Sequence, residues 1–350
     1  MDYGYINARM RGMKSRLLSH RDLDDLILKP DLASLIADLE NSPYREDVIE
    51  AKGHLSGILC IESALRQNFI KTFRKIQDFT RQEEDAEQYI RIFLHRWDVQ
   101  NIKTILRGKN IHATSEEILD CLVPAGELDE VTLKELLKQP DVKAVIDMLA
   151  TWQIRYSKPL TESFPEFVKT KDLALLECAL DQFYYADALA TVKKPSYNNA
   201  LICDLLALEV DVINIRTVLR MVRDHVDPAE AERYLIGGGK EFDEKTLHNL
   251  LSLPKIGDVV KALMATRYRF LADIPESAVR TQNISVIEKK LERFLIKQGA
   301  GAFRLDPLSI ASVVGYFWAK YNEITNLRII SRCKTADFPV ENLKEELVYV

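Results

Sequence analysis

The stretch DVQNIKTILR, residues 98–107, is repeated almost letter for letter as DVINIRTVLR at residues 211–220. The sequence EITNLRIISR, residues 323–332, follows the same pattern. Each copy has an acid three residues before an asparagine, a base two residues after it and an arginine six residues after it. The three asparagines are 113 and 112 residues apart, so the sequence predicts a threefold internal repeat.

The repeated positions supply the candidate interface residues of this chain. They are Asp98, Asn101, Lys103, Arg107, Asp211, Asn214, Arg216, Arg220, Glu323, Asn326, Arg328 and Arg332. A partial fourth copy near the N-terminus adds Asn7 and Arg9. We call the three complete copies the first, second and third motif.

Two further landmarks keep the same period and the same order. The pattern L-x-x-L-[IL]-x-x-P occurs at 23–30, 133–140 and 247–254, and E-x-x-L begins at Glu62, Glu177 and Glu288. A period near 112 residues is much longer than that of solenoid repeats, so each repeat is expected to be a small domain of several helices. We predict repeat I at 1–111, repeat II at 112–224, repeat III at 225–335 and a C-terminal tail at 336–350.

The composition predicts helices. The 350 residues include only 13 glycines and 12 prolines, too few for the frequent turns of an all-β sandwich or barrel. A content of 47% hydrophobic and 29% charged residues excludes a disordered chain. Ile90, Phe93, Leu94 and Trp97 recur at helical spacing, and Gly108 is expected to cap the end of their helix. We therefore predict an all-α protein.

A helical wheel places the motif acid inside the apolar arc and the two bases on the opposite face. A carboxylate buried there needs an arginine, a lysine or a backbone donor from another segment. The motif then forms either a polar seam, where one repeat docks on the next or on an axial partner, or a contact between helices of one repeat. The two bases belong to that seam or form a solvated face.

Several function classes find no support in the sequence. The net charge of −5, from 48 basic and 53 acidic residues, does not favour nucleic acid as a partner. The five cysteines and six histidines show no metal-ligand spacing, and residues 237–240, GGGK, lack the spacing of a phosphate-binding loop. Gly126 matches Gly239 at the repeat distance, which predicts a turn at each repeat entry. We expect no catalytic, cofactor or metal site, no signal peptide and no membrane span.

The sequence resembles the C subunit of archaeal-type (A-type) ATP synthases, a family related to the d subunit of the V-type ATPase. The resemblance rests on the N-terminal YGYINARMRGMKS at 3–15, on WDVQNIKTILRGK at 97–109, and on the triplication. It covers roughly residues 3–335.

The resemblance implies a three-lobed helical funnel with pseudo-threefold symmetry and no active site or cofactor. It implies a rotor part, one copy per complex, on the cytoplasmic side of the cell membrane. Its partners would be the D and F subunits of the central shaft and the membrane proteolipid (c/K) ring, and it would transmit torque between ion translocation and ATP synthesis without binding nucleotide directly. The alternative is a cytosolic scaffold of three helical domains that binds unrelated helical partners.

In a cyclic array of repeats, the partial N-terminal motif and the third motif are expected to lie at its seam.

Overall fold

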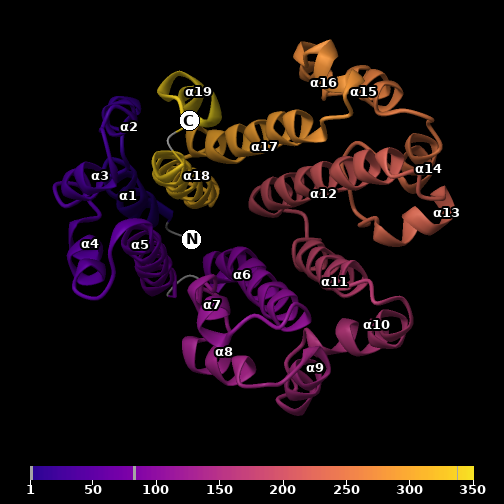
Figure 1. Cartoon of the computed structure of the whole chain (residues 1–350), viewed down its shortest axis with the longest axis horizontal. Helices are drawn as coiled ribbons and strands as arrows, with labels where there is room; N and C mark the ends of the chain where they lie inside the picture. Colours follow the sequence, from indigo (N-terminus) through magenta and orange to yellow (C-terminus); the bar gives the residue numbers. More distant parts are fainter. Residues whose placement is uncertain (1–2, 82–83, 337) are drawn as a thin grey trace. The chain divides into compact units, whose positions relative to one another are not determined.

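A computed structural model describes residues 3–81, 84–336 and 338–350 of the chain. Within these ranges every regular element is helical, as Figure 1 shows. The all-α class predicted from the composition and the apolar spacing is confirmed. Across the same ranges, no helix combines the length and the apolar character needed to cross a bilayer.

The chain divides into two compact units. The terminal unit combines the residues up to Arg91 with Ile296–Val350, and the middle unit is Ile92–Leu295. The boundaries between them lie inside two long helices, α6 (Glu84–Asn110) and α17 (Ile284–Gly301). The terminal unit further contains α1 (Tyr3–Lys14), α2 (His20–Ile27), α3 (Leu32–Leu39), α4 (Arg45–Lys52), α5 (Gly57–Thr80), the 3-10 turn η3 (Ala302–Arg304), α18 (Ala311–Thr335) and α19 (Val340–Glu346).

The middle unit is one continuous piece of chain. It contains α7 (Ser115–Asp120), α8 (Glu130–Leu137), α9 (Val142–Thr151), α10 (Ser157–Thr170), α11 (Ala174–Thr191), α12 (Tyr197–Arg223), α13 (Pro228–Ala231), the 3-10 turn η1 (Glu232–Tyr234), α14 (Glu244–Leu251), α15 (Ile256–Met264), the 3-10 turn η2 (Arg269–Asp273) and α16 (Glu276–Arg280).

The order of the helices follows the order of the sequence landmarks. The L-x-x-L pattern lies on the short helices α2, α8 and α14, and the segment after the proline forms α3, α9 and α15. The E-x-x-L pattern lies on α5, α11 and α17, and the three motifs lie on α6, α12 and α18. The short helices begin at equivalent caps: the side chains of Ser19, Asp129 and Asp243 each accept a hydrogen bond from the backbone N–H three residues later.

One helix end differs from the prediction. Gly108 does not cap α6, because the helix continues to Asn110. A Cβ at position 108 would collide with the side chain of Ile118, so this glycine allows the segment that follows α6 to pack closely against it. The residue therefore serves packing within the middle unit and does not end the helix.

The core of the terminal unit joins the two ends of the sequence. Helices α1 and α5 both pack against α18, and the rings of Phe73 and Phe317 lie 4.4 Å apart between centroids. Gly315 brings α18 against η3, since a Cβ there would collide with the backbone of Phe303. The partial N-terminal motif and the third motif thus lie on helices that contact each other.

Candidate functional site

The three motif asparagines make the same pair of hydrogen bonds. Asn101 donates to the carbonyl oxygen of Val123 and accepts from its N–H, both at 2.8 Å. Asn214 forms the same pair with Ile236, again at 2.8 Å. Asn326 bonds Val348 at 2.8 and 3.1 Å. In each case the buried amide is bound to the backbone of the residue 22 positions later, and it satisfies both polar groups of that residue.

The acid of the first motif binds a backbone turn of the middle unit. One carboxylate oxygen of Asp98 accepts the N–H of Leu128 at 2.9 Å, and the other accepts the N–H of Glu127 at 3.0 Å. Gly126 lies directly against the same carboxylate, where a Cβ would collide with it. The glycine is therefore required by the close approach of this turn to the acid.

The acid of the second motif repeats this arrangement. Asp211 accepts the N–H of Glu241 at 2.9 Å, and a Cβ on Gly239 would again collide with the carboxylate. The hydroxyl of Tyr268 adds a longer contact to the carboxylate at 3.4 Å. The predicted turns at Gly126 and Gly239 thus have a common purpose, which is to bring backbone N–H groups onto a buried acid.

The third motif carries the longer Glu323, and its donors come from the beginning of the chain. The carboxylate accepts the backbone N–H of Leu18 and the hydroxyl of Tyr44. The ammonium of Lys320 adds a third donor at 2.9 Å. Leu18 precedes the L-x-x-L pattern by the same five residues as Leu128 does, so the third acid binds the N-terminal repeat as the first acid binds repeat II.

Burial changes the acid–base behaviour of these groups. It raises the pKa of Asp98 and of Asp211 to about 6, although the backbone N–H donors partly oppose the shift. Burial and the nearby Glu323 carboxylate raise the pKa of Tyr44 well above its usual value. Backbone N–H donors thus offset part of the cost of burying the Asp98 and Asp211 carboxylates, whereas Glu323 is also paired with Lys320.

The motif bases pair with the E-x-x-L glutamates. Arg107 holds Glu177 through two hydrogen bonds of 2.5 and 2.6 Å. Arg220 binds Glu288 at 2.7 Å, and Arg332 binds Glu62 at 2.8 Å.

The bases two residues after the asparagine support these pairs. Lys103 binds Asp181 at 2.7 Å, and Arg328 binds Glu62 at 3.0 Å. Arg216 donates to the carbonyl oxygen of Glu288 at 3.3 Å. Every motif base therefore contacts the segment predicted as the following repeat, and for the third motif that segment is the first repeat.

A set of tyrosines completes the pattern and was not found from the sequence. Tyr44, Tyr156 and Tyr268 are fully buried and 112 residues apart. Tyr44 and Tyr268 contact the motif acids Glu323 and Asp211. Burial, together with the nearby charge of Asp98, raises the pKa of Tyr156. The signal that reveals them is their identical spacing, since their surrounding sequences share no motif.

Asn7 and Arg9 do not repeat the motif contacts. Asn7 is buried on α1, where its side-chain oxygen accepts a hydrogen bond from the hydroxyl of Ser312. Arg9 is exposed and its guanidinium lies 5.7 Å from the ring centroid of Phe79. The partial fourth copy therefore joins α1 to α18 and α5 within the terminal unit, without the backbone pairing that the complete motifs make.

The groups most suited to a metal ion lie beside the first motif. One ligand atom each from His95, Asp98 and Glu127 lies within 4.8 Å of the others. Both oxygens of Asp98 already accept backbone hydrogen bonds, and His95 Nε2 lies 2.9 Å from Glu127 Oε1. The cluster is accounted for by these contacts, which attach the turn at Glu127 to α6.

The contacts of the motifs fasten segments of the chain to one another. Comparison with known proteins agrees with this structural character. A family model described as ATP synthase (C/AC39) subunit matches residues 6–346. The chain belongs to this family. Members are accessory, non-catalytic subunits of a rotary ATP synthase, and this chain is therefore a subunit of such a complex.

Relatives of this family match over nearly their whole length. The chain is 32% identical to the A-type ATP synthase C subunit of Methanococcoides burtonii, covering 99% of this chain and 94% of the relative. It is 31% identical to the corresponding protein of Methanosarcina acetivorans, with 100% and 93% covered. The corresponding protein of Haloferax volcanii is 28% identical, with 98% and 97% covered. The resemblance seen in the motifs is thereby confirmed.

Proposed function

We propose that this chain links the D and F subunits of the central shaft to the membrane proteolipid (c/K) ring of an A-type ATP synthase. In this role it transmits torque between ion translocation and ATP synthesis, as one copy per complex on the cytoplasmic side of the cell membrane. It binds neither nucleic acid nor nucleotide in doing so.

The observation that carries the proposal is the recurrent fastening of each motif to the segment that follows it. A part that passes torque between a ring and a shaft has to resist shear, and resistance requires directional contacts as well as buried apolar area. Buried asparagine pairs, backbone-bound acids and paired bases supply such contacts at Asn101, Asn214 and Asn326. This stiffening suits a transmitting element better than a flexible scaffold.

The domain organisation belongs to the same proposal. Repeats at 1–111, 112–224 and 225–335, with a tail at 336–350, would form a pseudo-threefold funnel. Support comes from the equal spacing of the motif contacts and from the third motif, whose Glu323 and Arg332 bind Leu18 and Glu62 of the first repeat. A cyclic relation between three repeats is the arrangement that pseudo-threefold symmetry requires.

We assign the motif residues to the inter-repeat contacts, and their exposed arginines also to the shaft contact. In the middle unit, a hollow of about 380 Å³ is lined by bases of the first two motifs, Lys103, Arg107, Arg216 and Arg220, together with the acids Glu177 and Asp181. Arg107 and Arg220 are each paired with one glutamate but remain more than half exposed, so their free N–H groups can also bind an acidic helical partner.

Native mass spectrometry of solubilised membranes tests the proposal, with this chain as bait. We expect one copy together with the D and F subunits and the proteolipid ring. A double charge reversal, Arg107→Glu with Arg220→Glu, should reduce recovery of the shaft, whereas Lys245→Glu on an exposed surface should not. Recovery of a purely soluble set of partners without ring proteins would contradict the proposal and favour the scaffold.

A further inference from the structure

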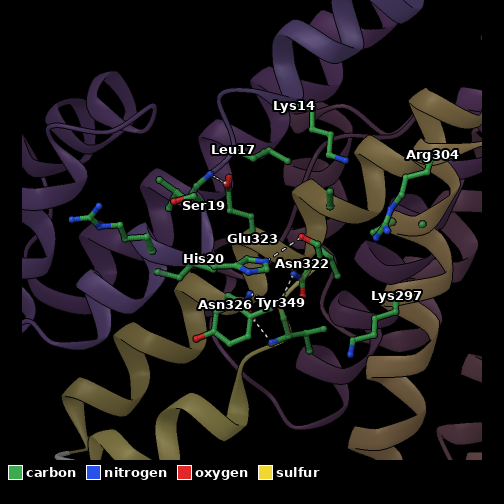
Figure 2. A pocket seen from close by; sticks show the side chains of 18 residues that line it. Lys14, Leu17, Ser19, His20, Lys297, Arg304, Asn322, Glu323, Asn326 and Tyr349 are labelled. Carbon is green, nitrogen blue, oxygen red and sulfur yellow. Dashed lines mark hydrogen bonds between the residues drawn. The ribbon is translucent and has the colours of Figure 1, made fainter. Parts of the chain in front are cut away.

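The terminal unit contains a cavity of about 860 Å³ beside the third motif. Its walls come from the end of α1, the segment 17–23, α17, α18 and residues 348–350 (Figure 2). The cavity is much larger than the space that a few ordered water molecules need.

The location of the cavity follows from the way the third motif differs from the other two. After the first motif the chain runs without a break from Val123, the partner of Asn101, to Leu128, the partner of Asp98. The turn between them packs Gly126 onto the acid.

At the third motif the corresponding partners are Val348 and Leu18, which no short loop joins. Both residues line the cavity, along with Glu323. The cavity therefore lies next to the acid where a connecting turn packs in the first two motifs.

The walls of the cavity are strongly cationic. Lys14 from α1, Lys297 from α17 and Arg304 from η3 follow one another along one side (Figure 2). None of the three lies within ion-pair distance of a carboxylate in the described parts of the chain. Burial and the nearby charge of Arg304 lower the pKa of Lys14, as expected where two cations lie close together.

The acidic side chain in the described wall does not offset this charge. Glu323 is already bound by Lys320, by the hydroxyl of Tyr44 and by the backbone N–H of Leu18. Lys320 brings one positive charge for the one negative charge of Glu323. Arg21 and the carboxylate of Val350 also line the cavity, and their opposite charges balance. Lys14, Lys297 and Arg304 therefore give the cavity an excess of positive charge.

The wall also holds a buried acceptor that lacks a donor. Asn322 is only 3% exposed; its Nδ2 donates to Val348 O at 2.8 Å, and its Oδ1 has no partner among the described residues. Four residues before the asparagine, the first two motifs have the apolar Trp97 and Val210. A buried acceptor without a donor destabilises the fold, so this polar residue calls for a ligand that donates a hydrogen bond.

We propose that this cavity binds an oxyanion of the phosphate class, either free or as a phosphate monoester headgroup. The negative charge is bound by Lys14, Lys297 and Arg304, and a P–OH proton or a hydroxyl beside the phosphate is donated to Asn322 Oδ1. Long basic side chains from three separate elements bind such an anion with charge-assisted hydrogen bonds. The inference does not depend on the coupling role proposed above.

The test is a calorimetric titration of the purified chain with inorganic phosphate and, separately, with sulfate. At about pH 8 both anions carry a charge near −2, but phosphate retains a proton that it can donate and sulfate does not. We expect phosphate to bind at least about tenfold more tightly, the ratio that one hydrogen bond of about 1.4 kcal/mol gives.

Three variants separate the contribution of the Asn322 hydrogen bond from that of the basic side chains. Asn322→Val, the residue of the second motif at this position, should abolish the preference for phosphate over sulfate. Arg304→Gln changes an exposed side chain and leaves the core intact, and it should lower the affinity for both anions by about tenfold or more. Lys245→Gln in the middle unit should change neither affinity.

Sedimentation with vesicles at about pH 6, where a phosphate monoester retains a proton that it can donate, distinguishes the two sources of the phosphate group. Binding to vesicles that contain phosphatidic acid, lost in Arg304→Gln and competed by phosphate, supports a headgroup. Binding of inorganic phosphate without vesicle binding supports a free anion. Equal affinities for phosphate and sulfate, or binding that survives Arg304→Gln, would overturn the proposal.

Discussion

Replacing Asn214 by alanine removes a completely buried polar contact of the middle unit. The side chain is 0% exposed and makes two hydrogen bonds of 2.8 Å to Ile236, one to each backbone polar group. After Asn214→Ala the N–H and the carbonyl of Ile236 remain buried without partners. At about 1–2 kcal/mol for each lost bond, we expect a loss of about 3 kcal/mol in the free energy of local opening.

Hydrogen–deuterium exchange followed by mass spectrometry measures this loss where it occurs. The peptide covering residues 232–242 should exchange about two orders of magnitude faster, because each 1.4 kcal/mol corresponds to a factor of ten. This local readout suits a chain with two compact units better than a single unfolding midpoint does.

Two further variants show whether hydrogen bonding or simple filling of space is responsible. Asn214→Leu restores the volume but not the bonds, so it should be no more protected than Asn214→Ala. Asn41→Ala is the matched control, since the Asn41 amide is exposed and donates only to the carbonyl of Ala37 at 3.0 Å; its effect should stay below about 1 kcal/mol. Full protection in Asn214→Leu would refute the reasoning.

Three further predictions concern the ion pairs, the buried acids and the glycine turns. Glu62→Arg should destabilise the terminal unit by about 1 kcal/mol, because the pair is partly exposed, and adding Arg332→Glu should restore part of the loss in a urea double-mutant cycle. The pKa of about 6 for Asp98 lies above its value in the unfolded chain, so its contribution to stability is present at about pH 4 and is lost as the pH rises through 6. Over this pH range the urea midpoint should fall less in Asp98→Asn than in the wild type. Gly126→Ala, which drives a Cβ into the Asp98 carboxylate, should lower the thermal midpoint of the middle unit by several degrees, whereas Gly237→Ala, where a Cβ meets nothing within 4 Å, should not.

Each of these predictions has a clear contrary result. Failure of Arg332→Glu to restore any stability would show that Glu62 does not act through this pair. A parallel pH dependence in wild type and Asp98→Asn would assign the slope to other groups. Equal thermal midpoints for the two glycine variants would mean that the turn at Gly126 moves away from the acid without cost.

The helices and their order could be predicted because their causes are local. Apolar residues at helical spacing and a cap four residues before each L-x-x-L pattern are written in the sequence at Ser19, Asp129 and Asp243. The end of α6 was misplaced because Gly108 resembles a helix cap, while its actual function is the close packing of Ile118. That packing depends on tertiary structure, which a local pattern does not contain.

The candidate site was predictable in its residues and only partly in its contacts. The burial of Asp98 and its need for an outside donor followed from its place on the helical wheel, and backbone N–H groups at Glu127 and Leu128 supply that donor. The pairing of Arg107 with Glu177 was missed, although both belong to patterns of the same period. One sequence shows that two patterns recur together, but it does not show which copies meet.

The discontinuous terminal unit has a consequence for biosynthesis. Tyr44 and its partner Glu323 are 279 residues apart, so at about 5–20 residues per second the ribosome takes roughly 15 to 55 seconds to make the second after the first. The middle unit is continuous and can fold as it emerges. In α1 and α5, the surface that packs against α18 stays exposed until α18 has been synthesised. Protection of this nascent N-terminal segment by a chaperone is therefore expected to matter more for the yield of folded protein than any help given to the middle unit.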